Sequence, residues 1–526
     1  MLSTRLTRWL RPALPFIAAL LLGACNTVTR APDPIKDAPR ADAATVIVSI
    51  TANTTLVRGF NNLIVQQVTP SGAQKAGEQH ALNQIAPGLS RDTALFVGML
   101  PEGEYEFAHF SDTTSNRRID LGAGSRELIG RFKVARGQTV DLGRLVLTPV
   151  SLKVVIGRSV KITSNKPLID RYAPEYATLF KNGTVAGWSG PRHADDNVEA
   201  FALSRPVGFD HPVEADDGTL LGASRLGSVI LRTPKAQWRA VRSPGLESLL
   251  DVMPVKTNDA VLLAVGEFNT LLRLPPGGHD FVPMNTGNLP AGNLVFIAGD
   301  EVHGWYVAQQ RKDELTIYRS LFLENGDWQP VRKESVGFSF WSGQDMFWPW
   351  RRADGFSYAT SDGKLNHLDY ASGQWRSMTA PKERHISNIV ANPDGSLGIL
   401  VPGGSGLAGM FAELYLSQDQ GKTWTEVKPK NSVRESPPMR LRSGTMLVRS
   451  IEMLTNVELN ASKDGGQTWL PRKERTRGTL TALPSGRLVS VETGSIFSVN
   501  LSTDEGDTWR TGYTDFDMPS EASAKK

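Results

Sequence analysis

The segment "LSQDQGKTW", residues 416–424, decides the fold, because the chain spells it two more times. Close copies, "ASKDGGQTW" and "LSTDEGDTW", occupy residues 461–469 and 501–509, and each follows an apolar, strand-like run. A polar motif that returns at a regular distance indicates a repeated supersecondary unit. The residues that define the three copies are Ser417, Asp419, Gly421, Trp424, Ser462, Asp464, Gly466, Trp469, Ser502, Asp504, Gly506 and Trp509.

The spacing of the closing aromatic residue gives the number of repeats. Counted back from Trp509, aromatic residues at the end of similar or degraded segments recur at intervals of 40, 45, 49, 47, 47 and 43 residues. These residues are Trp469, Trp424, Trp375, Trp328, Phe281 and Trp238. Intervals of this length fit the four strands of one propeller blade. We therefore predict an all-β protein with a seven-bladed β-propeller over residues 205–515.

Tight-turn signals between apolar runs provide a second marker. They are "ADDGT" (215–219), "TNDA" (257–260), "DEVHG" (300–304), "RADG" (352–355), "NPDG" (392–395), "RSG" (442–444) and "PSG" (484–486). Asp-Gly and Ser-Gly pairs between strands predict hairpins, because glycine supplies the positive φ of such turns. The two markers agree on seven units, although "TLFKNGTVAGW" (178–188) leaves an eighth blade open.

The residue types of the repeated motif suggest a structural role. Its Asp can accept hydrogen bonds from its own turn, and its Trp can pack between neighbouring sheets. The motif resembles the Asp-box, or BNR repeat, of sialidases, sortilin-type receptors and photosystem assembly-factor-like propellers. That resemblance implies a fold-stabilising turn on the outer part of each blade, away from the central funnel. We predict no metal at Asp419, Asp464 and Asp504, because each turn brings a single carboxylate and calcium needs several oxygen ligands.

The first residues of the chain predict export. Three arginines flank the start of the apolar run "PALPFIAALLLGA" (12–24), which is short for a membrane span. The following "LGAC" (22–25) resembles the bacterial lipobox, which implies that residues 1–24 are a signal peptide and that Cys25 is lipidated. By the same resemblance, Asn26 favours sorting to the outer membrane. We expect a lipid-anchored protein of the bacterial cell envelope.

Charge and cysteine content exclude some classes of function. The net charge of +4 falls to about +1 without residues 1–24, which hold three arginines and no acidic residue. A nearly neutral chain gives no electrostatic reason to bind nucleic acid. Cys25 is the only cysteine, so the protein can form no intramolecular disulfide. We expect a monomer.

The region before the propeller has a different sequence pattern. Residues 25–43 are rich in Pro, Ala and charge and predict a flexible tether. Residues 44–156 predict a small β-sandwich, followed by a proline-interrupted connecting segment (157–204). Its strand-like runs are 44–52, 62–68, 93–100, 104–110, 127–134 and 144–156. The phrases "LPEGEYEF" and "VARGQTVDLG" resemble transthyretin-like or carboxypeptidase-regulatory-like modules. Residues 516–526 form a tail.

The resemblance to sialidases implies a catalytic-site arginine whose position can be checked in the first blade. It implies an arginine just before the first inner turn, where this chain has Asp210, His211 and Pro212. Arg205 stands too early, and Arg273 falls on the wrong strand of the next blade. Without that arginine a substrate carboxylate loses its bidentate partner. We therefore expect no catalytic residues, no cofactor and no metal, with a sialidase-like glycoside hydrolase with a displaced site as the alternative.

One stretch is unusual in composition, "FSFWSGQDMFWPWRRADG" (338–355). It enters the fourth blade, and its Trp and Arg side chains are of the types favoured at binding hot spots. Packing between blades is the alternative for the same aromatic residues. The candidate binding residues are Trp341, Trp348, Trp350 and Arg351, with Asp210 and His211 of the first blade. The sequence thus predicts a non-enzymatic, envelope-anchored propeller that binds a protein or a glycan at its funnel.

Overall fold

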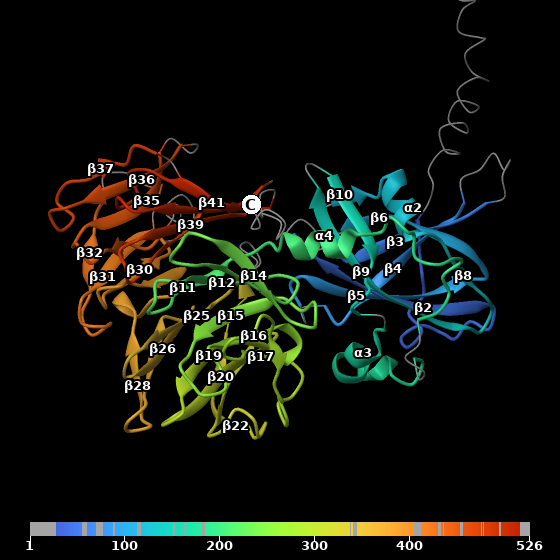
Figure 1. Ribbon diagram of the computed structural model, residues 1–526, viewed down its shortest axis with the longest axis horizontal. Coiled ribbons are helices and arrows are strands. Elements are labelled where there is room, and N and C mark those ends of the chain that lie inside the picture. The colour runs from blue at the N-terminus through green and yellow to red at the C-terminus, as the bar shows by residue number, and fades with distance from the viewer. Residues whose placement is uncertain are drawn as a thin grey trace, which may run out of the picture.

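The protein consists of two all-β parts, an N-terminal domain and a β-propeller, which lie side by side in Figure 1. The structure is a computed structural model. It describes residues 28–54, 60–69, 77–87, 90–112, 117–150, 153–162, 164–180, 185–336, 338–339, 344–403, 412–429, 433–434, 436–452, 456–474, 476, 478–493 and 496–515. The predicted fold class is confirmed. Cys25 and the signal peptide lie outside the described residues, so their roles stay predictions.

The N-terminal domain is a single ten-stranded sheet. Its strands are β1 (Val28–Arg30), β2 (Ala43–Ala52), β3 (Asn62–Gln67), β4 (Gln79–Ile85), β5 (Thr93–Pro101), β6 (Gly103–Asp112), β7 (Arg117–Asp120), β8 (Phe132–Val134), β9 (Thr139–Val150) and β10 (Lys153–Arg158). They follow the order β10-β9-β2-β5-β4-β3-β6-β7, with β1 beside β4 and β8 beside β6. One apolar core joins Val46, Leu63, Phe107 and Leu145 from four of these strands. The layers of the expected sandwich are therefore parts of one curved sheet, a half-barrel.

Two predicted strands of this domain differ in the structure. Residues 127–134 contain the end of helix α2 (Ala123–Ile129) and the short strand β8. Gly130 separates them because its φ of +79° is a conformation that ends a helix and that glycine adopts readily. Residues 144–156 hold most of the β9–β10 hairpin, so they are two strands and not one.

The predicted tether is part of the fold from Val28 onward. Strand β1 pairs in parallel with β4, and Ala31 and Asp33 are buried. The Tyr176 hydroxyl donates a hydrogen bond of 2.8 Å to the Asp33 carboxylate. The prediction of a flexible tether is therefore wrong for the described residues of this segment. Its polar composition gives no indication of the few contacts that order it.

The connecting segment packs against both parts of the protein. It contains α3 (Lys166–Tyr172), η1 (Pro174–Tyr176) and α4 (Val198–Ser204). Ile169 and Tyr176 cover the N-terminal sheet at Ile47 and Val97. Helix α4 lies between the two parts in Figure 1, where Ala202 and Leu203 join a cluster with Val146, Leu226 and Leu246. In the described residues this segment adds no eighth blade.

The propeller has seven blades among the described residues, and each is built from consecutive antiparallel strands. Blades one to three are β11 (Asp210–Glu214), β12 (Leu220–Ser224), β13 (Ser228–Arg232), β14 (Trp238–Arg242); β15 (Leu249–Pro254), β16 (Leu262–Gly266), β17 (Thr270–Leu274), β18 (Val282–Pro283); and β19 (Asn293–Asp300), β20 (Gly304–Arg311), β21 (Glu314–Ser320), β22 (Gln329–Ser335). Blades four and five are β25 (Phe347–Arg352), β26 (Gly355–Thr360), β27 (Lys364–Asp369), β28 (Trp375–Thr379); and β29 (Asn388–Ala391), β30 (Leu397–Val401), β31 (Glu413–Ser417), β32 (Thr425–Val427). Blades six and seven are β33 (Val433–Arg434), β34 (Met439–Arg440), β35 (Met446–Glu452), β36 (Asn456–Ser462), β37 (Leu470–Pro471); and β38 (Thr479–Ala482), β39 (Leu488–Thr493), β40 (Phe497–Ser502), β41 (Arg510–Thr514).

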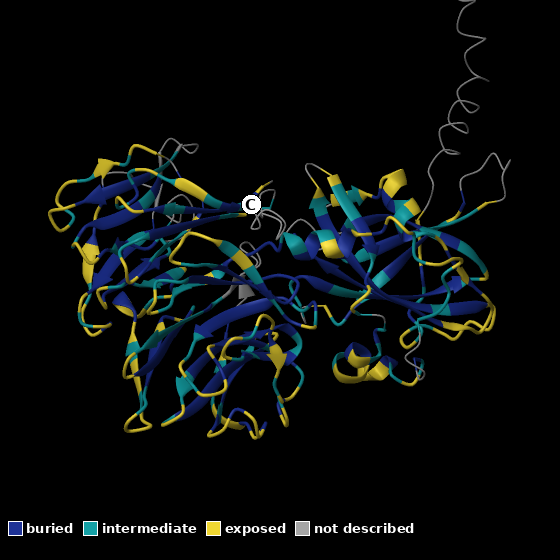
Figure 2. Ribbon diagram, in the orientation of Figure 1, coloured by how far each residue is buried: buried dark blue, intermediate teal, exposed yellow. Residues whose placement is uncertain are grey.

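Short elements complete the propeller. The hairpin of β23 (Phe338–Ser339) and β24 (Gln344–Asp345) lies between blades three and four, and η2 (Glu267–Asn269) and η3 (Pro381–Glu383) are single turns. The predicted turns all fall between the first and second strands of a blade, and each marker aromatic directly precedes or begins the fourth strand. Figure 2 shows buried strand centres and exposed turn tips in both parts.

The ring closes by side-chain packing between blades one and seven. Among the described strands none is exchanged, because both blades are complete in consecutive strands. Phe209 and Trp238 of blade one pack with Val489 and Tyr513 of blade seven in one core cluster. The Tyr513 hydroxyl also donates a hydrogen bond of 2.7 Å to the Pro206 carbonyl. Tyr513 is thus a buried residue of the outer strand β41.

The three copies of the repeated motif, which we label Asp-box motifs after the resemblance described above, share one network of hydrogen bonds. In the first, the Ser417 hydroxyl donates to Asp419 (2.8 Å) and accepts from the Gly421 amide (2.7 Å). Asp419 also accepts from the amide and the hydroxyl of Thr423, at 2.8 and 2.6 Å. Gly421 needs to be glycine because its φ is +95°. Trp424 packs against the core between blades four and five, so the motif joins neighbouring blades.

Candidate functional site

The strand order gives the propeller two different faces. Because strands alternate in direction, the first-to-second turns and the Asp-box turns lie on one face, which we call the Asp-box face. The opposite face carries the connections between the second and third strands and those between blades, and we call it the loop face.

The N-terminal domain is attached to the loop face at blades one and two. Asp92 pairs with Arg225, which lies between β12 and β13, at 3.1 Å, and the side chains are 3% and 5% exposed. Arg144 pairs with Glu247, which lies between β14 and β15, at 2.8 Å. Such buried pairs favour one docked geometry, because a shift of one partner within the junction would leave the other charge buried without its counter-ion. The two parts therefore form one unit at this junction.

Glu267 carries a third, unusual contact of the same junction. It is fully buried between β16 and β17 and accepts a hydrogen bond of 2.6 Å from the Ser90 hydroxyl and another from the Arg91 amide. Burial, together with the nearby Asp92 carboxylate, raises the pKa of Glu267 to about 7. The protonation of this one carboxyl group therefore contributes to docking of the N-terminal domain.

Arg351 links the inner strands of three blades near the propeller axis. Its guanidinium forms an ion pair with Asp251 of blade two, donates a hydrogen bond of 2.9 Å to the Ile297 carbonyl of blade three, and lies 4.8 Å from the Phe296 ring centre. Asp251 is 1% exposed and the Arg351 side chain 25% exposed. A buried carboxylate from another blade thus binds the charge of Arg351, and the role of this residue in ligand binding stays a prediction.

Trp348 and Trp350 point to the opposite side of the same strand. Side chains alternate along β25, so Phe347 and Arg351 face blade three, whereas the two tryptophans pack against the cluster that holds Ile389 of blade five. Both tryptophans are half-buried. Their described contacts are those of inter-blade packing. Trp341 lies outside the described residues, and its role stays a prediction.

Asp210 and His211 lie at the start of β11, at the edge of the loop face. The register of β11 against β12 shifts between Asp210 and Val213, and His211 is exposed with a φ of +47°. The two arginines that could substitute for the sialidase arginine are engaged elsewhere. Arg205 ends helix α4 and stacks on Phe201 at 4.7 Å, and Arg273 lies on β17, 3.9 Å from Glu324.

A charged loop between blades four and five is a candidate that the sequence prediction missed. Lys382 and Glu383 are exposed and have φ values of +58° and +53°, which are strained for residues other than glycine. Glu413 accepts hydrogen bonds from Lys382 (2.9 Å) and Arg384 (3.0 Å) and from the Tyr415 hydroxyl. The Tyr415 and Lys382 contacts lower the pKa of Glu413 to about 2. The signal in the sequence is "APKERH" (380–385), a charged run in an inter-blade connection.

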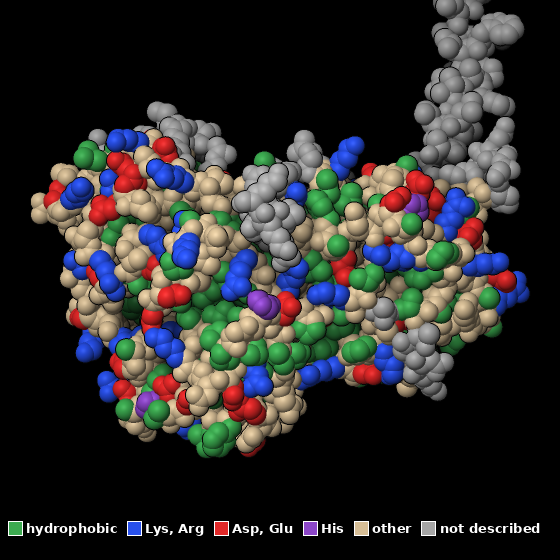
Figure 3. Space-filling view, viewed as in Figure 1, with side chains coloured by type: hydrophobic (Ala, Val, Ile, Leu, Met, Phe, Trp, Pro, Cys, Tyr) green, Lys and Arg blue, Asp and Glu red, His purple; other side chains and the backbone are tan. Residues whose placement is uncertain are grey.

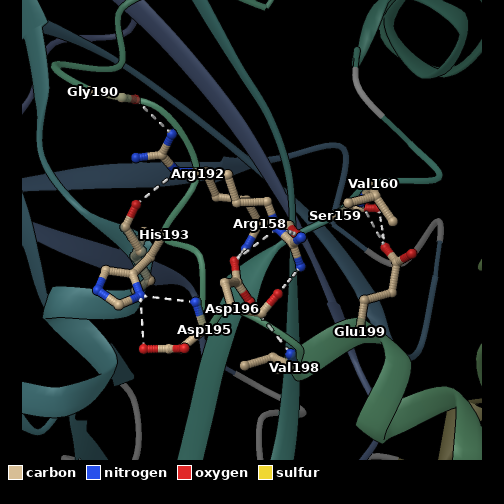
Figure 4. A network of polar contacts seen from close by, with 11 residues as sticks. Arg158, Ser159, Val160, Gly190, Arg192, His193, Asp195, Asp196, Val198 and Glu199 are labelled. Carbon is tan, nitrogen blue, oxygen red and sulfur yellow. Dashed lines mark hydrogen bonds and ion pairs between the residues drawn. The ribbon is translucent and has the colours of Figure 1, made fainter.

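A second polar network lies in the connecting segment and is structural. Asp196 accepts hydrogen bonds from the Arg158 amide (2.8 Å) and from Arg192 (3.1 Å), while Glu199 binds the Ser159 hydroxyl, as Figure 4 shows. His193 in the same view faces Asp195 and makes no contact with Ser159. The network fastens the connecting segment to β10, and its Ser159 hydroxyl and Glu199 carboxylate are both buried.

Comparisons with known proteins found similar solved structures but no family. No protein-family model and no curated protein matches the sequence. Solved structures similar to the chain include YCF48 from Cyanidioschyzon merolae (TM-score 0.39, 14% identity, covering 54% of this chain and 92% of that one). Others are YCF48 bound to D1 peptide (TM-score 0.37, 18% identity, 51% and 82%) and puromycin hydrolase (TM-score 0.42, 14% identity, 60% and 55%). The chain is a seven-bladed β-propeller protein. Similarity at this level concerns the fold and says nothing about a shared ligand.

Proposed function

We propose that the protein is a non-enzymatic propeller of the bacterial cell envelope, anchored through a lipid on Cys25, that binds a protein partner on its loop face. The observation that carries the proposal is the loop of Lys382 and Glu383. Two adjacent strained residues at an exposed inter-blade connection, fastened by Glu413, resemble the pre-organised loops at which binding is concentrated.

The distribution of charge supports a protein partner over nucleic acid. Basic and acidic side chains are interspersed on the face shown in Figure 3, and the charged loop itself carries both signs. A mixed pattern of this kind suits a specific protein surface, since complementary charges fix the register of a complex. A glycan partner is the alternative outcome. In the described residues, no helix is long and apolar enough to cross a membrane, and the lipid on Cys25 is our proposal for attachment.

Site-specific photocrosslinking in cells tests the proposal. A photoreactive amino acid placed at Glu383 or His385, both exposed on the loop face, should give a covalent adduct with one envelope protein. The matched control is Gln467, which is exposed in an Asp-box turn on the opposite face. The same adduct from Gln467, or no adduct from either loop position, contradicts the proposal. Adducts with a polysaccharide would assign the face to a glycan.

A further inference from the structure

The turns of blade four on the Asp-box face bring together three metal-ligating side chains. One ligand atom each from Asp354, His367 and Asp369 lies within 4.8 Å of the other two. Asp354 stands in the turn between β25 and β26, and His367 and Asp369 belong to β27. These are rigid elements, so the three groups are held together by the blade itself.

The imidazole is oriented as a ligand by a neighbouring hydroxyl. His367 is 7% exposed, and its Nδ1 lies 3.0 Å from the Ser357 hydroxyl. With Nδ1 protonated and donating to Ser357, the lone pair of Nε2 faces Asp354, 3.7 Å from Oδ2. Metal-binding histidines use this second hydrogen bond to fix the ring and its tautomer.

The carboxylates provide the charge. Asp369 uses Oδ1 to accept hydrogen bonds from the amide (2.8 Å) and hydroxyl (2.6 Å) of Ser372. Its Oδ2 is therefore available for a cation. In the Asp-box motifs, by contrast, both carboxylate oxygens accept hydrogen bonds from the turn, as Asp419 shows. Blade four has lost that arrangement, because its turn reads "DYASGQW".

We propose that Asp354, His367 and Asp369 form a binding site for Zn²⁺. One imidazole nitrogen and two carboxylate oxygens suit zinc, which binds nitrogen and oxygen ligands at about 2.0–2.2 Å and in three-ligand sites keeps a position for water. Calcium and magnesium favour sites made of oxygen alone. Tetrahedral ligands lie about 3.4 Å apart, so binding draws the three groups slightly closer.

Arg352 competes for the same site. It forms two hydrogen bonds with Asp354, of 2.8 and 2.9 Å, and also contacts Gln420. A carboxylate oxygen has a second lone pair, so Arg352 and the metal ion can share Asp354, although the guanidinium charge weakens binding. Removal of that charge should therefore increase the affinity for zinc, whereas a purely structural Arg352–Asp354 pair predicts no such gain.

Calorimetric titration of the metal-stripped full chain with ZnCl₂ tests the site. We expect one equivalent of Zn²⁺, an affinity at least tenfold weaker in His367→Gln and in Asp369→Asn, and a tighter affinity in Arg352→Gln. His303→Gln is the matched control, because the His303 imidazole pairs with a single carboxylate, Asp300, at the corresponding turn of blade three and otherwise stacks on the Tyr370 ring. Circular dichroism verifies that each variant is folded. If His367→Gln does not fold, Asp369→Asn tests the site instead, because Asp369 is the more exposed position.

Two results would overturn the assignment. One is the absence of saturable Zn²⁺ uptake by the wild-type chain. The other is uptake that does not depend on the histidine, shown by unchanged uptake in His367→Gln and Asp369→Asn or by Ca²⁺ binding of equal strength, since an acidic surface alone would behave in this way.

Discussion

Replacement of Arg351 by methionine should destabilise the propeller more than it affects any ligand. The substitution leaves the Asp251 carboxylate, which is 1% exposed, without its ion-pair partner. Removal of one member of a buried pair costs about 3–5 kcal/mol. The Arg351 side chain is one quarter exposed, so water reaches part of the pair, and we expect a loss of about 2–4 kcal/mol.

Urea unfolding followed by tryptophan fluorescence measures this loss. The companion variant, Arg351→Met with Asp251→Asn, removes the charge that the single variant leaves buried, so it should recover more than half of the lost stability. The asparagine side chain introduced there can still accept from the Ile297 amide, which donates to Asp251 at 3.0 Å. A loss below about 1 kcal/mol in Arg351→Met would show that the pair is solvated and that Arg351 is available to a ligand.

Other residues give four further predictions. Because the pKa of Glu267 is raised in the folded protein, Glu267 stays protonated there at pH values at which the unfolded chain has already lost this proton. The free energy of unfolding should therefore fall by on the order of 2 kcal/mol as the pH rises from 5 to 8. Glu267→Gln should flatten this dependence, as measured by urea unfolding at each pH. Hydrogen bonds from Thr468 and Ser462 hold the pKa of Asp464 below its usual range. Asp464→Asn should therefore lower the melting temperature at neutral pH, and the difference from the wild type should shrink as the pH falls below the usual pKa of an aspartate. Trp350→Ala should cost about 2–4 kcal/mol of stability through lost inter-blade packing, again by urea unfolding, and an unchanged stability would make it a surface residue. Cys25→Ser should release the protein from membranes after a salt wash, and continued membrane fractionation would contradict lipid anchoring.

Local rules are sufficient to predict the propeller. Each blade repeats the same chemistry: a turn that needs glycine or aspartate, and an aromatic residue, such as Trp238 or Trp509, that packs beside the fourth strand. These signals lie within one blade, so a single sequence displays them. The segment at 127–134 was ambiguous, because its short apolar run fits a strand or a helix until Gly130 is known to end α2.

The environment of the candidate binding residues was harder to predict, because the contacts that determine it come from other blades of the ring. Arg351 and Asp251 are 100 residues apart, and nothing near either residue indicates the other. The aromatic stretch therefore resembled a binding surface, although Trp348 and Trp350 pack between blades. The strained loop at Lys382 was missed for a related reason. Its positive φ values are a property of the backbone, and lysine and glutamate are not residue types that indicate a positive φ in a sequence.

Quantitative co-purification from detergent-solubilised envelopes tests the central claim most directly. The wild-type chain, a loop-face variant (Lys382→Glu with His385→Glu) and an Asp-box-face variant (Gln467→Glu) are compared by mass spectrometry. Lys382 and His385 are exposed on the loop that carries the proposal, and Gln467 is exposed on the opposite face. We expect one partner protein in near-stoichiometric amount that the loop-face variant loses and the Asp-box-face variant keeps. A partner that both variants keep, or that only the Asp-box-face variant loses, would contradict it.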